Sequence, residues 1–304
     1  AHIGAIHELA KMGIEPDIVV GSSVGAVVGG AYASGNLEPF EEWISGLGRV
    51  DIIRLLDAKM TGGGFLQGKS LMGAIGEQIG DPQIEELDIP FACVATELDS
   101  GRELWLREGS LLDACRASIA LPGMFAPSRD FEGRLLVDGG VVNPVPVSLA
   151  RAMGGEIVIA VNLNGDLIGR HFFVHEGDDE EDEEDDRLLA EIEEKDSTIA
   201  KWAARMKTGF GVRLDSYISS LRKKESPDPG LFDVIAGSID IMQDRITRSR
   251  MAGEPPDVLI NPKLSHIGLM DFDRAEESIA EGRAATKRRR ADIEALPGIV
   301  RGKD

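Results

Sequence analysis

The sequence has few of the residues on which several classes of protein depend. It holds two cysteines, Cys93 and Cys115, in 304 residues. Two cysteines in apolar surroundings provide neither a disulfide framework nor the spacing of a zinc site, so we expect buried free thiols in a reducing compartment. No signal peptide and no run of about twenty apolar residues is visible. We therefore predict a soluble, cytoplasmic protein, and we expect it to need no cofactor and no metal.

Positive charge is also in short supply. The chain has 33 Lys and Arg against 53 Asp and Glu, which gives a formal net charge of −20. Such a chain is repelled by nucleic acid and is not drawn electrostatically to anionic membranes. We expect no nucleic-acid partner. A peripheral contact with a membrane stays open, because a lipid-facing surface requires neither a membrane span nor a leader peptide. The oligomeric state also stays open.

The length and the 42% hydrophobic content are sufficient for one large α/β core. Residues 1–164 are predicted to form most of this core, and the strand and helix of residues 251–304 to complete it. Residues 165–250 are predicted to be an insert. Its acidic run, residues 176–186, is interpreted as a self-repelling loop, with calcium binding as the weaker alternative, and residues 187–250 as long helices.

The most informative stretch runs from Asp17 to Ala33. A short β-branched run predicts a buried strand, Gly21-Ser22-Ser23-Val24-Gly25 is a G-x-S-x-G, and a small-residue helix follows. Strand, tight turn and helix are the context of a nucleophile elbow. The turn is expected to strain the backbone of Ser23 and to push its Oγ beyond the end of the strand. Gly21 and Gly25 are expected to let the strand and the helix pass closely, because glycine has no Cβ. The Val24 N–H at the helix start is the predicted oxyanion donor.

A carboxylate stands in the position that such a serine requires. Residues 135–137 are predicted to be a strand that ends at Asp138, and Gly139 and Gly140 then free the backbone to turn. Because sites in α/β proteins gather at the carboxyl ends of strands, Asp138 is a candidate general base for Ser23. A phosphate site at the elbow is the less supported alternative, since the stretch has neither a Lys-Ser/Thr pair nor a G-x-G-x-x-G.

Further elements and side chains receive briefer interpretations. Ser118 is read as a structural residue within a helix, and His2 and His7 as packing or surface histidines. His266, with His171 and His175, is kept as a weak rival that would make a triad. The loop with Met124, Phe125 and Pro127 is a candidate lining for an apolar acyl pocket. The loop with Gly62-Gly63-Gly64 is interpreted as a lid or connector, with a phosphate cradle as the weaker alternative. The expected helices and strands lie at residues 1–13, 37–47, 50–56, 69–79, 91–97, 103–107, 156–161, 255–262 and 272–296.

Together these segments resemble the bacterial patatin-like phospholipase family. The stretches that carry the resemblance are Ala1–Gly35, Ala95–Gly101, Ala117–Pro127, Leu135–Ala150 and Pro256–Gly282. The resemblance implies a three-layer α/β/α fold with a mainly parallel central sheet. It also implies hydrolysis of lipid acyl esters, of phospholipase A or lysophospholipase type, by a Ser–Asp dyad without histidine. Carried onto this chain, Ser23 is the nucleophile and Asp138 is the base.

One part of the family pattern is not in this sequence. The family's oxyanion hole includes a glycine-rich loop with a basic residue, just before the helix that begins here at Ala1. A second hypothesis is therefore a catalytically impaired regulatory or binding protein on the same scaffold. Strong ester hydrolysis that is lost on Ser23→Ala would exclude it.

Overall fold

One strand that is buried along its whole length, β2 (Phe91–Glu97), organises the central sheet. The computed structural model describes residues 1–55, 67–166, 231–268 and 271–298. The chain divides into two compact units, one of residues 1–168 with 239–304 and one of residues 169–238. The sheet belongs to the first unit, and so do both candidate catalytic residues.

Two strands share one edge of β2. The strand β1 (Val19–Ser22) runs parallel to Phe91–Val94, and β5 (Leu135–Asp138) runs antiparallel to Ala95–Glu97. The third partner, β3 (Glu103–Leu106), pairs with Cys93–Thr96 and so overlaps both. Because a strand residue pairs with one neighbour on each edge, β3 occupies one edge and β1 and β5 follow each other along the other. The carboxyl ends of β1 and β5 therefore meet, beside Val94 and Ala95.

The remaining strands are short. The two-residue strand β4 (Ser128–Arg129) pairs antiparallel with β5, and β6 (Ile159–Val161) and β7 (Val258–Ile260) form a separate parallel pair. The five-stranded sheet is thus mixed: β1 is parallel to β2, and the β2–β3, β2–β5 and β4–β5 pairs are antiparallel. The predicted α/β class is confirmed.

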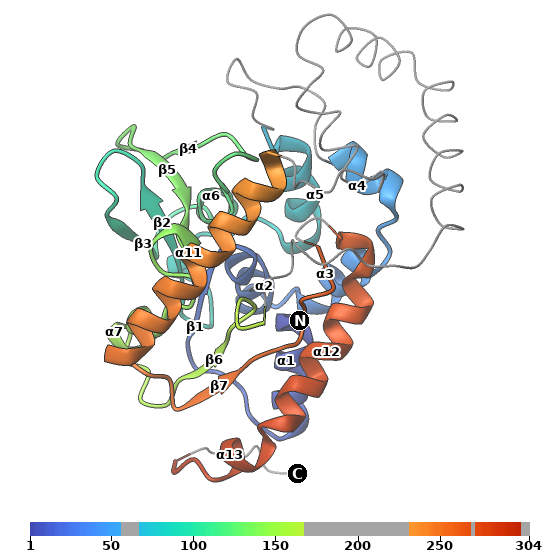
Figure 1. Cartoon of the computed structure of the whole chain (residues 1–304), viewed down its shortest axis with the longest axis vertical. Coiled ribbons are helices and arrows are strands. Elements are labelled where there is room, and N and C mark those ends of the chain that lie inside the picture. Colours follow the sequence, from blue (N-terminus) through green and yellow to red (C-terminus); the bar gives the residue numbers. More distant parts are fainter. Residues whose placement is uncertain (56–66, 167–230, 269–270, 299–304) are drawn as a thin grey trace, which may run out of the picture. The chain divides into compact units, whose positions relative to one another are not determined.

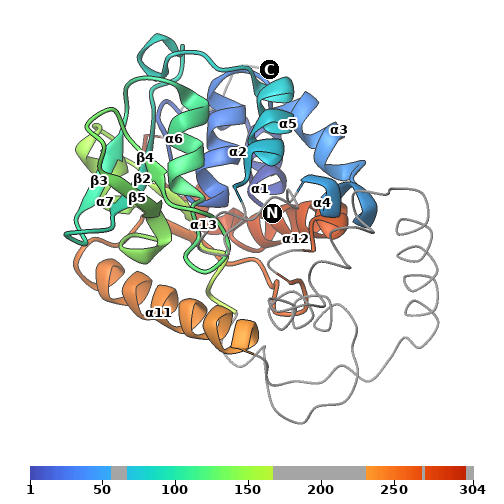
Figure 2. The same ribbon diagram turned by 90° about the horizontal axis from the view of Figure 1, so that it is seen from above.

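Helices cover both faces of β2, which explains why its sequence has almost no polar position. Phe91 and Cys93 pack in one cluster with residues of α2 (Val24–Ala33) and α6 (Leu111–Ser118). Ala92 and Val94 point the other way, onto Leu149 of α7 (Val147–Ala152). This alternation is the two-residue period of a strand buried on both faces. Figure 2 shows α7 on one side of the strands and α2 with α6 on the other, which confirms the three-layer fold.

The helices that the periodicity predicts are present close to their predicted bounds, but the one predicted at residues 272–296 is divided at Arg289 into two helices. The predicted helix at residues 69–79 is α5 (Lys69–Ile79), which begins after Gly68 in a left-handed conformation. The other helices of the described residues are α1 (His2–Lys11), α3 (Leu37–Ser45), α4 (Arg49–Leu55), α11 (Leu231–Gly253), α12 (Ala275–Arg288) and α13 (Arg290–Glu294). Single 3₁₀ turns occur at Ile84–Glu86, Gly139–Val141 and Phe272–Arg274. No helix of the described part of the chain is both long and apolar enough to cross a bilayer.

The first helix and the penultimate one are in backbone contact. Figure 1 shows α1 and α12 side by side, although they come from opposite ends of the chain. A Cβ at Gly4 would overlap the carbonyl oxygen of Ile279, and one at Gly282 would overlap that of Ala1. Each helix thus supplies one glycine that lets the two backbones touch.

Several sequence-based predictions lie outside the described residues. They concern Gly62-Gly63-Gly64, the acidic run of residues 176–186, the helices predicted within 187–230, and His171 and His175.

Candidate active site

The elbow serine has an unusual backbone conformation. Ser23 has φ 54° and ψ −129° and is the only non-glycine residue with positive φ in the described part of the chain. Such a conformation costs about 1–3 kcal/mol and persists only where the surroundings enforce it. A Cβ at Gly21 would overlap the backbone of Gly25 and Ala26, so the close passage of strand and helix requires this glycine. At Gly25 a Cβ would only touch the ring of His2, at 3.5 Å, so that glycine is not needed for space.

The side chains of Ser23 and Asp138 meet. The Ser23 Oγ donates a hydrogen bond of 2.6 Å to Oδ2 of Asp138, across 115 positions of sequence. Ser23 is also the N-cap residue of α2, where a serine normally accepts a bond from the helix backbone, but here its side chain makes no capping bond. The hydroxyl is therefore turned away from the helix and toward the carboxylate.

The turn after Asp138 holds the carboxylate in place. The Gly140 N–H donates to Asp138 Oδ1 at 2.6 Å, so the two carboxylate oxygens have different partners. A Cβ at Gly139 would overlap the carbonyl oxygen of Val94, which means that the end of β5 is pressed against β2. Only a glycine fits there.

The surroundings of Asp138 raise the pKa of its carboxyl group. Its side chain is fully buried, and this burial raises its pKa from 3.8 to about 6, although hydrogen bonds from Ser23 and the Gly140 N–H lower it in part. A carboxylate of pKa about 6 is mostly ionised at pH 7 and is a stronger base than an exposed aspartate. The site thus holds a base that is poised to take a proton from the adjacent hydroxyl.

Ser118 positions the elbow, which sequence reasoning missed. Its Oγ accepts a hydrogen bond of 2.9 Å from the Ser23 N–H and donates one of 2.7 Å to the carbonyl oxygen of Val94. It is the last residue of α6, not a mid-helix residue as predicted, and it is fully buried. The Val24 N–H lies in the first turn of α2, where the backbone N–H groups have no intrahelical acceptor.

Comparison with known proteins identifies the family. An uncharacterised NTE family protein of Mycobacterium tuberculosis is 34% identical, over 93% of this chain and 86% of its own length. Residues 1–151 match the family described as "Patatin-like phospholipase".

The chain belongs to the patatin-like phospholipase family.

Other members of the patatin-like phospholipase family match about half of the chain. The patatin-like phospholipase domain-containing protein 6 of Homo sapiens is 32% identical over 54% of this chain and 12% of its own length. A patatin-like phospholipase domain-containing protein of Caenorhabditis elegans is 33% identical over the same shares. The resemblance seen in the sequence is thereby confirmed, and the family it indicates is one of lipid hydrolases.

Two described histidines of this patatin-like chain, His266 and His7, have partners other than the dyad. His266, the candidate third member of a triad, has its Nε2 2.7 Å from Oε1 of Glu277. The His7 Nε2 lies 3.2 Å from Oε2 of Glu41. Since both oxygens of Asp138 are already engaged by Ser23 and Gly140, the structure does not bring His266 into the arrangement.

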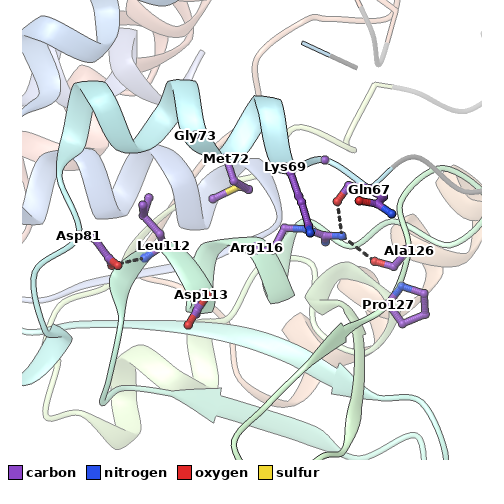
Figure 3. A pocket seen from close by; sticks show the side chains of 11 residues that line it. Gln67, Lys69, Met72, Gly73, Asp81, Leu112, Asp113, Arg116, Ala126 and Pro127 are labelled. Atoms are coloured by element: carbon purple, nitrogen blue, oxygen red, sulfur yellow. Dashed lines mark hydrogen bonds between the residues drawn. The ribbon is translucent and has the colours of Figure 1, made fainter. Parts of the chain in front are cut away.

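The apolar acyl pocket predicted at the loop after α6 stays a prediction. Phe125 is buried in a cluster with Ile52 and lies beside the guanidinium of Arg116. A cavity of about 530 Å³ borders this loop, and Pro127 lines it together with both apolar and charged side chains. Figure 3 shows Arg116 reaching across it to the carbonyl oxygens of Gln67 and Ala126. Neither Ser23 nor Asp138 lines this cavity.

No metal cluster accompanies the site. Within the described ranges, no group of three or more His, Cys, Asp and Glu side chains is placed to hold a metal ion.

Proposed function

We propose that this chain hydrolyses acyl esters of lipids, of phospholipase A or lysophospholipase type, through a Ser23–Asp138 dyad and an acyl-enzyme. The observation that carries the proposal is the 2.6 Å hydrogen bond from Ser23 Oγ to Asp138 Oδ2, on a backbone strained into an elbow. Family membership supplies the substrate class, lipid esters.

In the first half-reaction, Ser23 Oγ attacks the ester carbonyl carbon while its proton passes to Asp138 Oδ2. The tetrahedral intermediate then collapses, the bond to the leaving alcohol breaks, and Asp138 returns the proton to that alcohol oxygen. Oδ1 remains held by the Gly140 N–H throughout, so one carboxylate oxygen anchors the group and the other exchanges the proton.

In the second half-reaction, water takes the place of the alcohol. Asp138 accepts a proton from the water as its oxygen attacks the acyl carbon, and the proton then passes to Ser23 Oγ as the fatty acid leaves. Negative charge develops on the carbonyl oxygen in both steps, and we assign its stabilisation to the Val24 N–H at the positive end of α2.

Covalent labelling and turnover together test the proposal. A fluorophosphonate probe is expected to label the full chain at Ser23, with the site identified by mass spectrometry. Release of fatty acid from phosphatidylcholine and lysophosphatidylcholine is expected to fall by at least about 10³-fold in Ser23→Ala and in Asp138→Asn.

Ser22 provides a matched control for the neighbouring serine. Its hydroxyl is buried without a hydrogen-bond partner, so Ser22→Ala removes no bond and is expected to keep both labelling and turnover. If the probe labels Ser23 but no lipid ester is turned over, the binding-protein hypothesis replaces the hydrolase. Full turnover by Ser23→Ala would reject the dyad.

A further inference from the structure

The most exposed large apolar side chain of the described residues is Phe131, at the tip of the turn between β4 and β5. It is 94% exposed. Leu98, 48% exposed, lies on the neighbouring turn between β2 and β3. The Leu98 N–H donates to the carbonyl oxygen of Leu135 at 2.8 Å, which joins the two turns. They project from the same end of the sheet (Figure 1). We call Phe131 and Leu98 the apolar tip.

The turn that carries Phe131 is rigidly built. Oδ1 of Asp130 accepts hydrogen bonds from the N–H groups of Glu132 and Arg134, and Oδ2 accepts one of 2.6 Å from the Arg134 guanidinium. The side chain of Asp130 is only 8% exposed beneath the turn. Gly133, with φ +80°, closes the turn and accepts a bond from Arg129. The aromatic ring is thus held out into solvent by a fixed backbone, where burying it in an apolar phase would be favourable.

The charge around the apolar tip differs from that of the whole chain. Three arginines and four acidic residues lie in or next to the two turns: Arg102, Arg129, Arg134, Glu97, Asp99, Asp130 and Glu132. The tip is therefore nearly neutral, whereas the whole chain has a formal net charge of −20. A near-neutral tip suits a zwitterionic lipid surface. The strongly acidic remainder is repelled by an anionic one.

The tip also lies on the side of the sheet to which β1 leads. Val94 pairs with Ser22, the last residue of β1, and Leu98 is four residues further along the chain. At the usual rise of a strand, Leu98 lies about 13 Å beyond Val94. Val24, beside the nucleophile, is 44% exposed, so apolar surface is present next to the dyad as well. A bilayer that receives the tip therefore approaches the end of the sheet beyond the elbow.

We propose that Phe131 and Leu98 anchor this protein to the surface of a zwitterionic lipid bilayer. The choice of lipid as the occupant rests on the proposed lipid hydrolysis. The anchoring itself is a property of the two turns and requires no turnover.

Vesicle binding is measured in a Ser23→Ala background, so that lipid is not consumed. Sedimentation with phosphatidylcholine vesicles is expected to show binding by the parent, and a fall in the partition coefficient of about tenfold or more in Phe131→Ser with Leu98→Ser. Phosphatidylglycerol vesicles are expected to bind the parent more weakly. Phe131→Trp is expected to add tryptophan fluorescence that brominated phosphatidylcholine quenches.

Trp105 is the matched control. It is 43% exposed on β3, opposite Val94 and away from the two turns, so Trp105→Ser is expected to leave vesicle binding unchanged. Unchanged binding in the Phe131 and Leu98 double variant, no binding by the parent, or tighter binding to the anionic vesicles would overturn the proposal.

With Ser23 intact, the same double variant separates anchoring from chemistry. It is expected to hydrolyse a soluble short-chain p-nitrophenyl ester at the parental rate, which also shows that it is folded, and to lose most of its activity on vesicles. If the parent hydrolyses no ester of either kind, the proposed function fails, while the vesicle-binding result stands by itself.

Discussion

At the scale of single residues, Ser23 gives up ordinary stabilising interactions. It adopts a left-handed φ of 54° and makes no capping bond to α2, and its hydroxyl goes to Asp138 instead. A residue with an unfavourable backbone conformation and no capping hydrogen bond is typical of a functional site, where the surrounding structure maintains the strain.

The strain at Ser23 predicts an inverted order of stability for two variants that both lack the hydroxyl. Ser23→Gly is expected to be more stable than Ser23→Ala by about 1 kcal/mol, because glycine adopts a positive φ at no steric cost. Urea unfolding measures the difference. At Ser22, which lies in the extended strand β1, Ser22→Ala is expected to be more stable than Ser22→Gly, which is the usual order. The same usual order at Ser23 would mean that the backbone there is not strained.

The raised pKa of Asp138 predicts the acid limb of the pH profile. Since the general base must be ionised, kcat/KM is expected to fall about tenfold per pH unit below about 6, and to level off above it. The profile on a soluble ester gives the apparent pKa. An acid limb near 4, the ordinary value for aspartate, would show that burial does not act on the base as described.

The same pKa predicts a cost in stability. The folded protein binds a proton at Asp138 more tightly than the unfolded chain, so this group stabilises the fold below pH 3.8 and that contribution is lost as the pH rises through about 6. Asp138→Asn is therefore expected to raise the free energy of unfolding at pH 8, by at most about 3 kcal/mol, which is the size of a shift of about two pKa units. The gain should shrink at pH 4.5, and an equal gain at both pH values would contradict the ionisation account.

At the scale of elements, the two glycines after β5 differ in what surrounds them. A Cβ at Gly139 would meet the backbone of β2, whereas one at Gly140 would overlap only the amide of Gln243 on α11, with Asp138 Oδ1 3.0 Å away. Backbone cannot move aside, but the end of a glutamine side chain can.

We therefore expect Gly139→Ala to cost about 3 kcal/mol or more of stability and to abolish activity, and Gly140→Ala to be much milder. Adding Gln243→Ala to Gly140→Ala should recover part of its loss, because the clashing amide is then gone. Thermal unfolding and ester hydrolysis of the single and double variants make the comparison. Additive losses would mean that Gln243 does not limit the space at Gly140.

Much of the site could be predicted because its signals are local. The elbow is five consecutive residues between a strand and a helix, and Asp138 follows a strand directly. The meeting of β1 and β5 on one edge of β2 could not be predicted, since pairing between distant strands leaves no periodic trace. The role of Ser118 had a faint signal: it continues the buried stripe of Leu111, Ala114 and Cys115 on α6, where a serine needs a hydrogen-bond partner.

The predicted acyl pocket illustrates the same dependence on distant contacts. Apolar residues in a loop indicate burial but not what they are buried against, and Phe125 turned out to pack on Ile52 and Arg116. Sequence reasoning had no measure of how deep that loop lies.

At the scale of the whole molecule, the contact between α1 and α12 makes a test with matched glycines. Gly4→Ala would press a Cβ into the backbone of α12 and is expected to lower the free energy of unfolding by about 2 kcal/mol or more. Gly73 of α5 has open space around it, so Gly73→Ala should stabilise by up to about 1 kcal/mol through helix propensity. Two variants of equal stability would mean that the close helix crossing contributes nothing.

The shared edge of β2 has a consequence for when reactivity arises. β1 and β5 do not pair with each other; each pairs with its own half of β2, and β5 also pairs with the two-residue strand β4. A chain in which only one of these two strands has paired with β2 has either the elbow serine or the buried aspartate in place, but not the dyad. The serine therefore becomes reactive only when both strands have paired with β2, so reactivity at Ser23 reports that the sheet is fully assembled.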